Sequence, residues 1–216
     1  MSGTHFPQKH EPLIIKAENL GRKFNRHWIF RHLNFQLESG QNYTFIGPNG
    51  SGKSTLLQVV AGIMPATEGR VHYQHQGKSV APDLFFRSLV MAAPYLELIE
   101  ELTLAELIRF HVRFKPFRPG ISAKEVVEIM GLSGSSHKAI KYFSSGMKQR
   151  LKLGLAFFSD TPVLMLDEPT TNLDAQGFDW YQNHVLEYSR DRLLIICSNQ
   201  PQEYAFCRNL IDLRTG

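Results

Sequence analysis

The chain has 216 residues, of which 43% are hydrophobic and 20% are charged, and it carries a formal net charge of +4 at pH 7. This balance is typical of a globular chain with one sizeable core, and it argues against disorder. The lysines and arginines are scattered, so no direct nucleic-acid partner is required, and no apolar run approaches the roughly twenty residues of a membrane span.

The N-terminal part of the chain predicts strands. Residues 1–12 are polar and lack the apolar core of a signal peptide, so we expect a flexible N-terminal segment. The stretch from Leu13 to Glu38 indicates strands of a β layer, because apolar and polar residues alternate over part of it. Residues 69–77 are typical of a hairpin arm.

A glycine-rich segment, Gly-Pro-Asn-Gly-Ser-Gly-Lys-Ser-Thr, occupies residues 47–55. It follows a short β-favouring run and precedes an unbroken helix-like stretch, so the loop connects a strand to a helix and aims backbone N–H groups at phosphate oxygens. Lys53 supplies a cation for the β- and γ-phosphates, the Ser54 hydroxyl is placed to bind Mg²⁺, and Thr55 reaches a neighbouring phosphate. The pattern predicts binding of a nucleoside triphosphate. The predicted contacts are Gly47, Pro48, Asn49, Gly50, Ser51, Gly52, Lys53, Ser54 and Thr55.

The stretch from Leu102 to Asp160 is predicted to be helical. Two capping boxes begin at Thr103 and Ser122, each with a glutamate three residues later and apolar residues behind it. No long heptad insertion interrupts the stretch, so a coiled-coil arm is not expected.

A further helix is predicted to begin at Ser144. The Ser144 hydroxyl and the amides of Ser145 and Gly146 suit an anion site at a helix start, although an ordinary capped helix explains the same residues. On the following turns, the basic residues are interpreted as solvated charge. They are Lys148, Arg150 and Lys152.

The run Pro162-Val-Leu-Met-Leu ends in two acids, Asp167 and Glu168. An apolar run without polar alternation suits an interior strand of a parallel sheet, so the acids emerge at the carboxyl end, where open α/β sheets bind ligands. Asp167 is then a carboxylate for Mg²⁺ or its waters, and Glu168 can polarise the attacking water as general base. Two acids after a strand are more often a solvated turn, but the glycine-rich loop favours the metal site.

The two cysteines, Cys197 and Cys207, lie ten positions apart without the paired spacing of a zinc or redox site. We expect reduced, buried thiols of a cytosolic protein.

The order of these motifs resembles that of the ATP-binding cassette (ABC) ATPases from about residue 13 to the end. Residues 143–147, Phe-Ser-Ser-Gly-Met, resemble the family signature, and residues 171–174, Thr-Asn-Leu-Asp, look like its D-loop. The resemblance implies an α/β fold: a P-loop NTPase core of mostly parallel sheet with flanking helices, an antiparallel β layer, and an α-helical signature subdomain. It also implies a single domain over residues 13–216 with the helical part, about 95–160, inserted.

In that family two ATP molecules and Mg²⁺ are sandwiched in a head-to-tail dimer. The resemblance assigns Ser144 and Gly146 to the γ-phosphate held by a partner subunit, which makes a homodimer or a heterodimer, and it adds Asp174 of the D-loop. An aromatic residue lies over adenine in the family. Phe24 stands where a tyrosine is usual, Trp28 is the alternative, and packing or surface positions for both remain open.

Two positions depart from the family pattern. Counting back from Thr103 places Pro94 at or beside the Q-loop glutamine, and proline has no side-chain donor, so that link is missing or rerouted through Glu97 or a backbone carbonyl. Asn199 replaces the switch histidine and cannot carry a proton. With Glu168, Lys53 and Asn199 as catalytic residues, we expect slower hydrolysis that is not abolished.

The resemblance predicts the ATP-hydrolysing subunit of an ABC transporter, cytoplasmic and peripheral on the inner face of the cell membrane. The pathway itself would belong to a separate transmembrane subunit, and the short chain is interpreted as exporter-like. A non-transport ABC ATPase and a weakly hydrolysing ATP-binding switch are the alternatives. Residues 93–101 are expected to help form a cleft for a short helix of the membrane subunit, although their apolar side chains also suit burial within the lobe. These are Tyr95, Leu96, Leu98 and Ile99.

Overall fold

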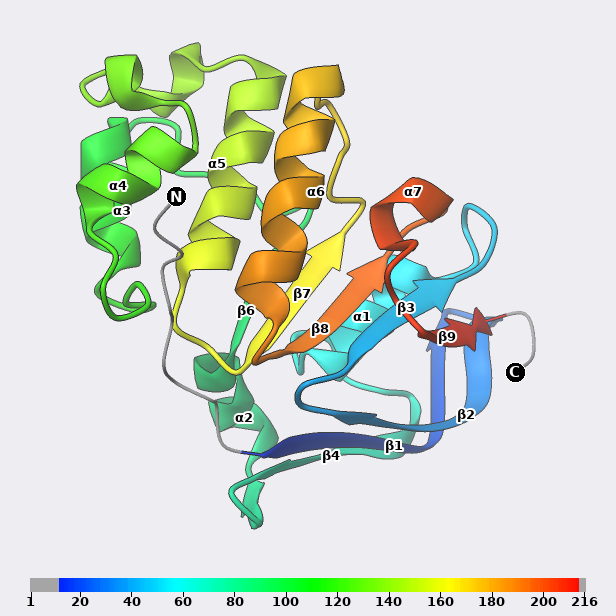
Figure 1. Cartoon of the computed structure of the whole chain (residues 1–216). Helices are drawn as coiled ribbons and strands as arrows, with labels where there is room; N and C mark the ends of the chain where they lie inside the picture. Colours follow the sequence, from blue (N-terminus) through cyan, green and yellow to red (C-terminus); the bar gives the residue numbers. More distant parts are fainter. Residues whose placement is uncertain (1–11, 214–216) are drawn as a thin grey trace.

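Two β-sheets of different strand direction organise the fold, which a computed structural model describes over residues 12–213 (Figure 1). All of the expected flexible segment except Pro12 therefore lies outside the described residues. The larger sheet is parallel throughout, with the strand order β6-β7-β8-β3-β9. Its strands are β6 (Leu89–Ala92), β7 (Val163–Asp167), β8 (Leu193–Cys197), β3 (Asn42–Ile46) and β9 (Asn209–Asp212).

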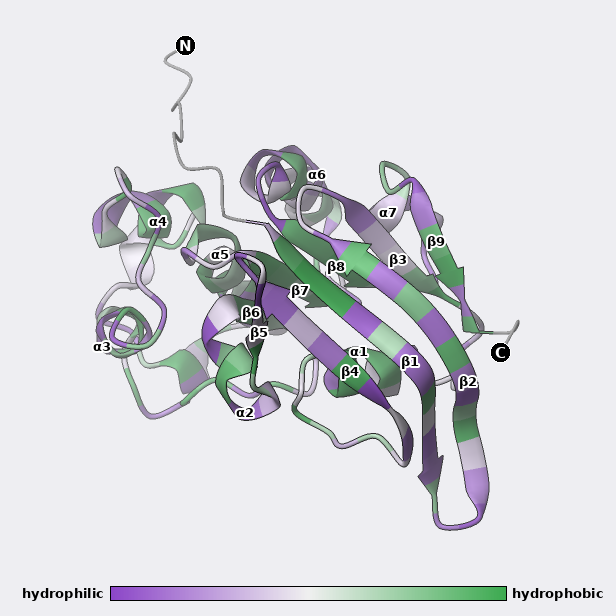
Figure 2. Ribbon diagram, turned by 90° about the horizontal axis from the view of Figure 1, so that it is seen from below, coloured by the Kyte–Doolittle hydropathy of each residue, from purple (hydrophilic) through white to green (hydrophobic). Residues whose placement is uncertain are grey.

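The smaller sheet is antiparallel, with the order β2-β1-β4-β5. Along the first part of β1, which lies between β2 and β4, buried Leu13, Ile15 and Ala17 alternate with less buried residues. Figure 2 shows hydrophobic and hydrophilic bands along the strands of this sheet. One face of this sheet therefore joins the core, and the predicted strands of a β layer are present. Its strands are β1 (Leu13–Phe24), β2 (His27–Glu38), β4 (Glu68–His75) and β5 (Lys78–Val80).

The parallel sheet is covered on both faces. Alternate residues of each strand point to opposite faces, so each strand contributes to two cores. On β7, Val163 and Met165 join the core that contains α1 (Lys53–Val60) and the antiparallel sheet. Leu164 and Leu166 join the core that contains the two longest helices. These helices are α5 (Ser145–Phe158) and α6 (Ala175–Ser189).

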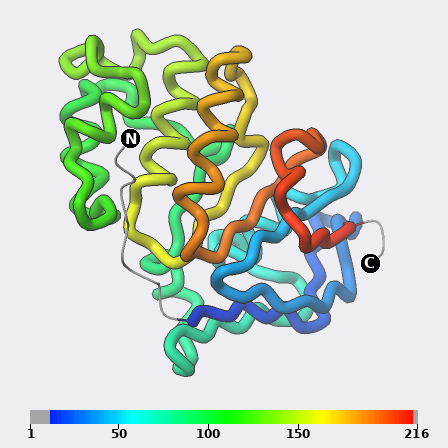
Figure 3. Tube along the Cα trace, in the orientation of Figure 1, coloured from blue at the N-terminus to red at the C-terminus, as the bar shows by residue number. Residues whose placement is uncertain are grey.

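The chain between β6 and β7 forms a helical lobe, whose path is followed most easily in the tube of Figure 3. Both predicted capping boxes are present, at Thr103 with Glu106 and at Ser122 with Glu125. The lobe contains α3 (Leu104–His111), α4 (Ala123–Ile129) and the 3₁₀ turns η2 (Ser133–Ser135) and η3 (Ile140–Tyr142). The remaining short elements are α2 (Pro82–Phe85), η1 (Phe86–Ser88) and α7 (Pro201–Tyr204).

Hydrophobic helices of membrane-spanning length are not found: within residues 12–213, no helix is long and apolar enough to cross a bilayer.

Candidate nucleotide-binding site

The glycine-rich loop connects β3 to the start of α1, as its sequence predicts. Lys53 is only 6% exposed. Its Nζ donates hydrogen bonds to the carbonyl oxygens of Gly47, at 2.9 Å, and Pro48, at 3.0 Å. The ammonium group therefore lies within the curve of the loop, close to the backbone N–H groups at the start of the helix.

Two glycines of the loop have no substitute. Gly52 has φ of +95°, and a Cβ there would lie 2.2 Å from Cγ2 of Ile29 on β2. Gly47 has φ of +154°, and a Cβ there would lie 2.6 Å from the Ser51 hydroxyl. The positive φ favours glycine at both positions, and at Gly52 the missing side chain also lets the antiparallel sheet approach the loop closely.

Asp167 ends β7 with its side chain 1% exposed, and both carboxylate oxygens are buried without a hydrogen-bond partner. Burial raises its pKa to about 6, while the nearby hydroxyl of Ser54 favours the charged form and the charge of Glu168 opposes it. The Ser54 hydroxyl thus approaches the carboxylate without completing a bond of ordinary geometry. Buried acceptors without donors are costly, which is the condition that a cation relieves.

These donors fit Mg²⁺. No group of three or more His, Cys, Asp or Glu side chains suited to a metal occurs in the described part of the chain. Mg²⁺ commonly takes one or two protein oxygens together with phosphate oxygens and waters, so it needs no such cage. One hydroxyl, of Ser54, and one carboxylate, of Asp167, are sufficient.

Glu168 occupies a strained position just after β7. Its φ is +42°, unusual for a residue with a side chain, and its backbone N–H donates to the Cys197 carbonyl at 2.8 Å. The bond holds Glu168 at the carboxyl edge of the sheet beside β8. Such backbone conformations persist where the surrounding structure enforces them, often in functional sites.

Asn199 follows β8 at the same edge. Its Nδ2 donates a 2.7 Å hydrogen bond to Oδ1 of Asn49 in the glycine-rich loop. Two side chains that are 150 residues apart in sequence thus meet beside the predicted phosphate site. The structure therefore places an amide donor beside the glycine-rich loop.

The signature and D-loop residues line one pocket of about 370 Å³. Ser144 caps α5 by accepting a 3.2 Å hydrogen bond from the Met147 N–H, and Asp174 caps α6 by accepting one of 2.7 Å from Gly177. Gly146 lies so close to the Asn172 carbonyl that a Cβ would be 3.1 Å away. The structure therefore brings Ser144, Gly146 and Asp174 together, and no residue of the glycine-rich loop lines this pocket.

The two candidate aromatic residues differ in accessibility. Phe24, at the end of β1, is 42% exposed, with the Arg22 guanidinium 4.6 Å from its ring centre. Trp28 is half-buried, and Lys23 and Arg31 lie 5.3 Å and 4.3 Å from its ring. Phe24 therefore has more free ring surface, and its contact with adenine stays a prediction.

The interpretation of the basic residues on α5 as solvated charge was wrong for Lys148 and Lys152. Lys148 forms a 2.5 Å ion pair with Glu100, and Nζ of Lys152 donates to the carbonyls of Ala93, at 3.3 Å, and Pro94, at 3.2 Å. The guanidinium of Arg150 lies 5.7 Å from the centre of the Trp180 ring. The two lysines tie α5 to the segment that follows β6.

Sequence reasoning missed one buried carboxylate, Glu203 of α7. Its side chain is fully buried and accepts hydrogen bonds from the N–H, at 2.9 Å, and the hydroxyl of Thr170, just after Glu168. The contact links the segments that follow β8 and β7. In the sequence, Glu203 is a single glutamate in a polar stretch, and nothing in that pattern predicts that its side chain is buried. Cys197 and Cys207 are both buried and free, as expected.

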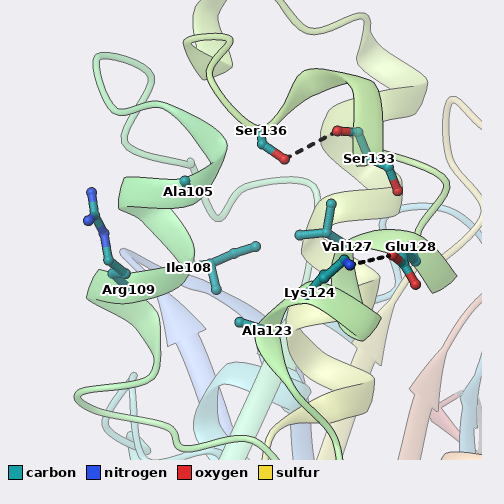
Figure 4. A pocket seen from close by; sticks show the side chains of 9 residues that line it. All are labelled: Ala105, Ile108, Arg109, Ala123, Lys124, Val127, Glu128, Ser133 and Ser136. Carbon is teal, nitrogen blue, oxygen red and sulfur yellow. Dashed lines mark hydrogen bonds and ion pairs between the residues drawn. The ribbon is translucent and has the colours of Figure 1, made fainter.

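A separate hollow of about 360 Å³ lies between α3 and α4 in the lobe (Figure 4). Ile108 and Val127 form its apolar wall, and Lys124 and Glu128, 3.9 Å apart, lie at its rim. None of the predicted nucleotide-binding residues lines it.

Comparisons with known proteins agree with this geometry. The family model described as ABC transporter matches residues 30–171. The cytochrome c biogenesis ATP-binding export protein CcmA of Agrobacterium fabrum (strain C58) is 33% identical over 87% of this chain and 89% of its own length. A solved ATP-binding subunit of an ABC transporter has a TM-score of 0.79 at 21% identity, covering 93% of this chain and 85% of that one. A solved dimeric bacterial ABC transporter cassette has a TM-score of 0.75 at 20% identity, covering 92% and 94%.

Proposed function

Because the chain belongs to the ABC transporter family, in which it is an ATP-binding and ATP-hydrolysing subunit, we propose that Lys53, Ser54, Asp167 and Glu168 form its hydrolysis site. The observation that carries this assignment is the buried Asp167 carboxylate, which lies without a partner beside the glycine-rich loop. The family works by energising a separate membrane subunit.

Binding is assigned to the loop between β3 and α1. The N–H groups of the loop and the Lys53 ammonium hold the β- and γ-phosphates, and Phe24 covers the adenine ring. Ser54 and Asp167 would hold Mg²⁺, which when bound neutralises charge on the phosphate oxygens. The positive end of α1 adds to this field.

Hydrolysis is assigned to the carboxyl edge of the sheet. Glu168 accepts a proton from the attacking water, and the strained turn and the bond to Cys197 fix its position. The amide of Asn199 donates to a γ-phosphate oxygen, where charge develops. Since this donor carries no charge, we expect turnover slower than a histidine would give.

The pocket formed by Ser144, Gly146 and Asp174 is proposed to close on the nucleotide of a second subunit. The absence of glycine-rich-loop residues from that pocket supports this arrangement, because each surface then needs a partner to complete a site. The dimeric form of the solved cassette agrees with it. We infer a head-to-tail dimer with ATP and Mg²⁺ at each interface.

An export role is proposed because the relative from Agrobacterium fabrum is an ATP-binding export protein by name. The subunit would then lie on the cytoplasmic side of the membrane, attached to a transmembrane partner. A weakly hydrolysing switch is the second candidate, because Pro94 and Asn199 replace two polar groups of the family pattern.

The test separates binding from chemistry. Lys53→Ala should weaken ATP binding by tenfold or more, on the order of 1.4 kcal/mol or more, because it removes the cation of the phosphate site. Glu168→Gln should bind ATP normally and accumulate as an ATP-bound dimer, because only the proton acceptor is lost. Equilibrium ATP affinity and dimer mass, measured for both variants, check these outcomes. Wild-type turnover in Glu168→Gln would contradict the base assignment.

A further inference from the structure

The segment that follows β6 places a tyrosine beside the predicted metal site. β6 and β7 are parallel neighbours, with Ala92 opposite Leu166, so the chain after β6 leaves the sheet next to Asp167. Tyr95 lies immediately after Pro94, which occupies or adjoins the family's glutamine position. The loss of the amide at Pro94 therefore leaves a phenol within reach of the same edge.

The direction of the Tyr95 ring follows from its contact with β6. The Tyr95 hydroxyl donates to Sδ of Met91 at 3.6 Å, and Met91 packs against the core on the α1 side of the sheet. Met165 lies in that same core. Because side chains two residues apart on a strand share a face, Asp167 also points to the α1 side. The hydroxyl is therefore folded back over the strand end toward Asp167.

The surroundings of the hydroxyl are polar and partly covered. Burial raises the pKa of Tyr95, the charge of Asp167 raises it further, and a contact with Gln58 opposes both. Gln58 and Ser54 lie four residues apart on α1, so they share one side of that helix. Tyr95 is 41% exposed as a whole, so the outer part of the ring faces solvent while the hydroxyl faces the site.

The competition for the phenol proton favours the carboxylate. A thioether sulfur is a weak acceptor. Asp167 presents two buried oxygens without a hydrogen-bond partner, and a hydrogen bond to an ionised acceptor is about twice as strong as a neutral one. A small rotation of the Tyr95 side chain away from Met91 would complete this bond.

The segment is held in place from the opposite side. Lys152 on α5 donates to the carbonyl oxygens of Ala93 and Pro94, and Lys148 pairs with Glu100. The backbone that carries Tyr95 is thus fixed to the helix that begins at the signature residues.

We propose that Tyr95 is a positioning residue that takes over the polar role of the missing glutamine, donating its hydroxyl proton to Asp167 or to a water held by Asp167. The inference rests on the proposed function, since it needs Asp167 and Ser54 as the metal-holding pair. By fixing one carboxylate oxygen, Tyr95 directs the other toward the Ser54 side of the site. Through Lys152, the same residue connects that site to the signature helix.

The test measures metal binding rather than turnover. Mn²⁺ is titrated into the protein saturated with a non-hydrolysable ATP analogue, and free Mn²⁺ is followed by electron paramagnetic resonance. Tyr95→Phe should raise the Kd for Mn²⁺ about tenfold, since groups that orient metal ligands typically contribute at least that factor. Affinity for the analogue without metal and the melting temperature should match those of the wild type.

Two controls isolate the hydroxyl. Tyr43→Phe removes a phenol that accepts a 3.2 Å hydrogen bond from the Glu38 N–H, at the far end of the sheet, and should leave Mn²⁺ affinity unchanged. Met91→Leu removes the competing sulfur acceptor and should not lower the affinity for Mn²⁺. Tyr95→Gln, which supplies an amide donor, should recover part of the affinity lost in Tyr95→Phe.

Three outcomes decide the matter. Wild-type Mn²⁺ affinity in Tyr95→Phe overturns the proposal. The proposal is also overturned if Tyr95→Phe lowers both the affinity for the analogue without metal and the melting temperature. The side chain would then have a structural role. If wild-type protein fails to bind the analogue at all, the proposed function itself fails, and this is distinguishable from either result.

Discussion

At the residue scale, we propose that Asn199 limits how fast the site can turn over ATP. Its amide already donates to Asn49, which shows that the segment after β8 lies against the glycine-rich loop. An amide can donate to a phosphate oxygen but brings no positive charge, so the stabilisation of developing charge is smaller than imidazolium would provide.

We predict that Asn199→His raises ATP turnover, by about tenfold or about 1.4 kcal/mol in activation free energy. Removal of one well-placed donor at such a position usually costs about 10²-fold or more, so this gain is modest. Steady-state hydrolysis at saturating Mg-ATP is compared for wild type, Asn199→His and Asn199→Ala. Equal rates in all three proteins would show that the γ-phosphate contact comes from another residue.

Single residues of this site could be predicted from the sequence where their neighbours in the chain are enough to identify their role. The order Gly-Lys-Ser at residues 52–54 and the acids after an apolar run need only their neighbours to be recognised. The contacts of Tyr95, Lys152 and Glu203 could not be predicted, because each depends on a partner from a distant segment. Burial of a charged group is invisible until that partner is placed.

At the element scale, α3 ends at His111, whose protonation links the stability of the fold to pH. Nε2 of His111 lies 2.8 Å from the Ser159 hydroxyl, and that hydroxyl donates its own proton to the Leu155 carbonyl at 2.6 Å. The Ser159 oxygen therefore accepts the Nε2 proton of His111. Burial lowers its pKa to about 4, and the nearby charge of Lys115 contributes.

The sign of the pH effect follows from linkage. The unfolded histidine, with a pKa of about 6.5, binds its proton before the folded one as the pH falls, so the free energy of unfolding decreases between about pH 6.5 and pH 4. We predict that His111→Gln reduces the loss of stability between pH 7 and pH 5 by up to about 2 kcal/mol. Urea unfolding at both pH values measures this difference. An NMR titration midpoint of His111 near 6.5 in the folded protein would contradict the prediction.

The elements themselves were predictable where capping and periodicity agree. Both capping boxes and the apolar strand β7 are present with the expected character. The strand order β6-β7-β8-β3-β9 was not predictable, because it places β3 between two strands from the C-terminal third of the chain. Side-chain pattern specifies which face of a strand is buried but not which strand lies beside it.

At the scale of the whole molecule, the segment 93–101 joins the parallel sheet to the helical lobe. From the sequence, its apolar residues suit either a docking surface for a membrane subunit or burial within the lobe, and the structure divides them between the two environments. Leu98 packs against the core that includes the lobe, whereas Ile99 remains 41% exposed. Together with the ties from Lys148 and Lys152, this leaves Ile99 on a surface whose backbone is fixed. A rigid apolar surface beside the nucleotide site suits a short helix of a membrane subunit.

The last prediction therefore concerns attachment to the membrane partner. Ile99→Glu should abolish binding of the purified chain to washed inside-out vesicles from the source organism, because it places a charge on the docking surface, while melting temperature and ATP affinity stay unchanged. Leu98→Glu should instead cost about 2 kcal/mol of stability, because its side chain packs in the lobe. Ile63→Glu is the matched control, since Ile63 is 57% exposed at the end of the turn after α1. Protease-treated vesicles separate a protein partner from lipid, and wild-type vesicle binding by Ile99→Glu would place the docking surface elsewhere.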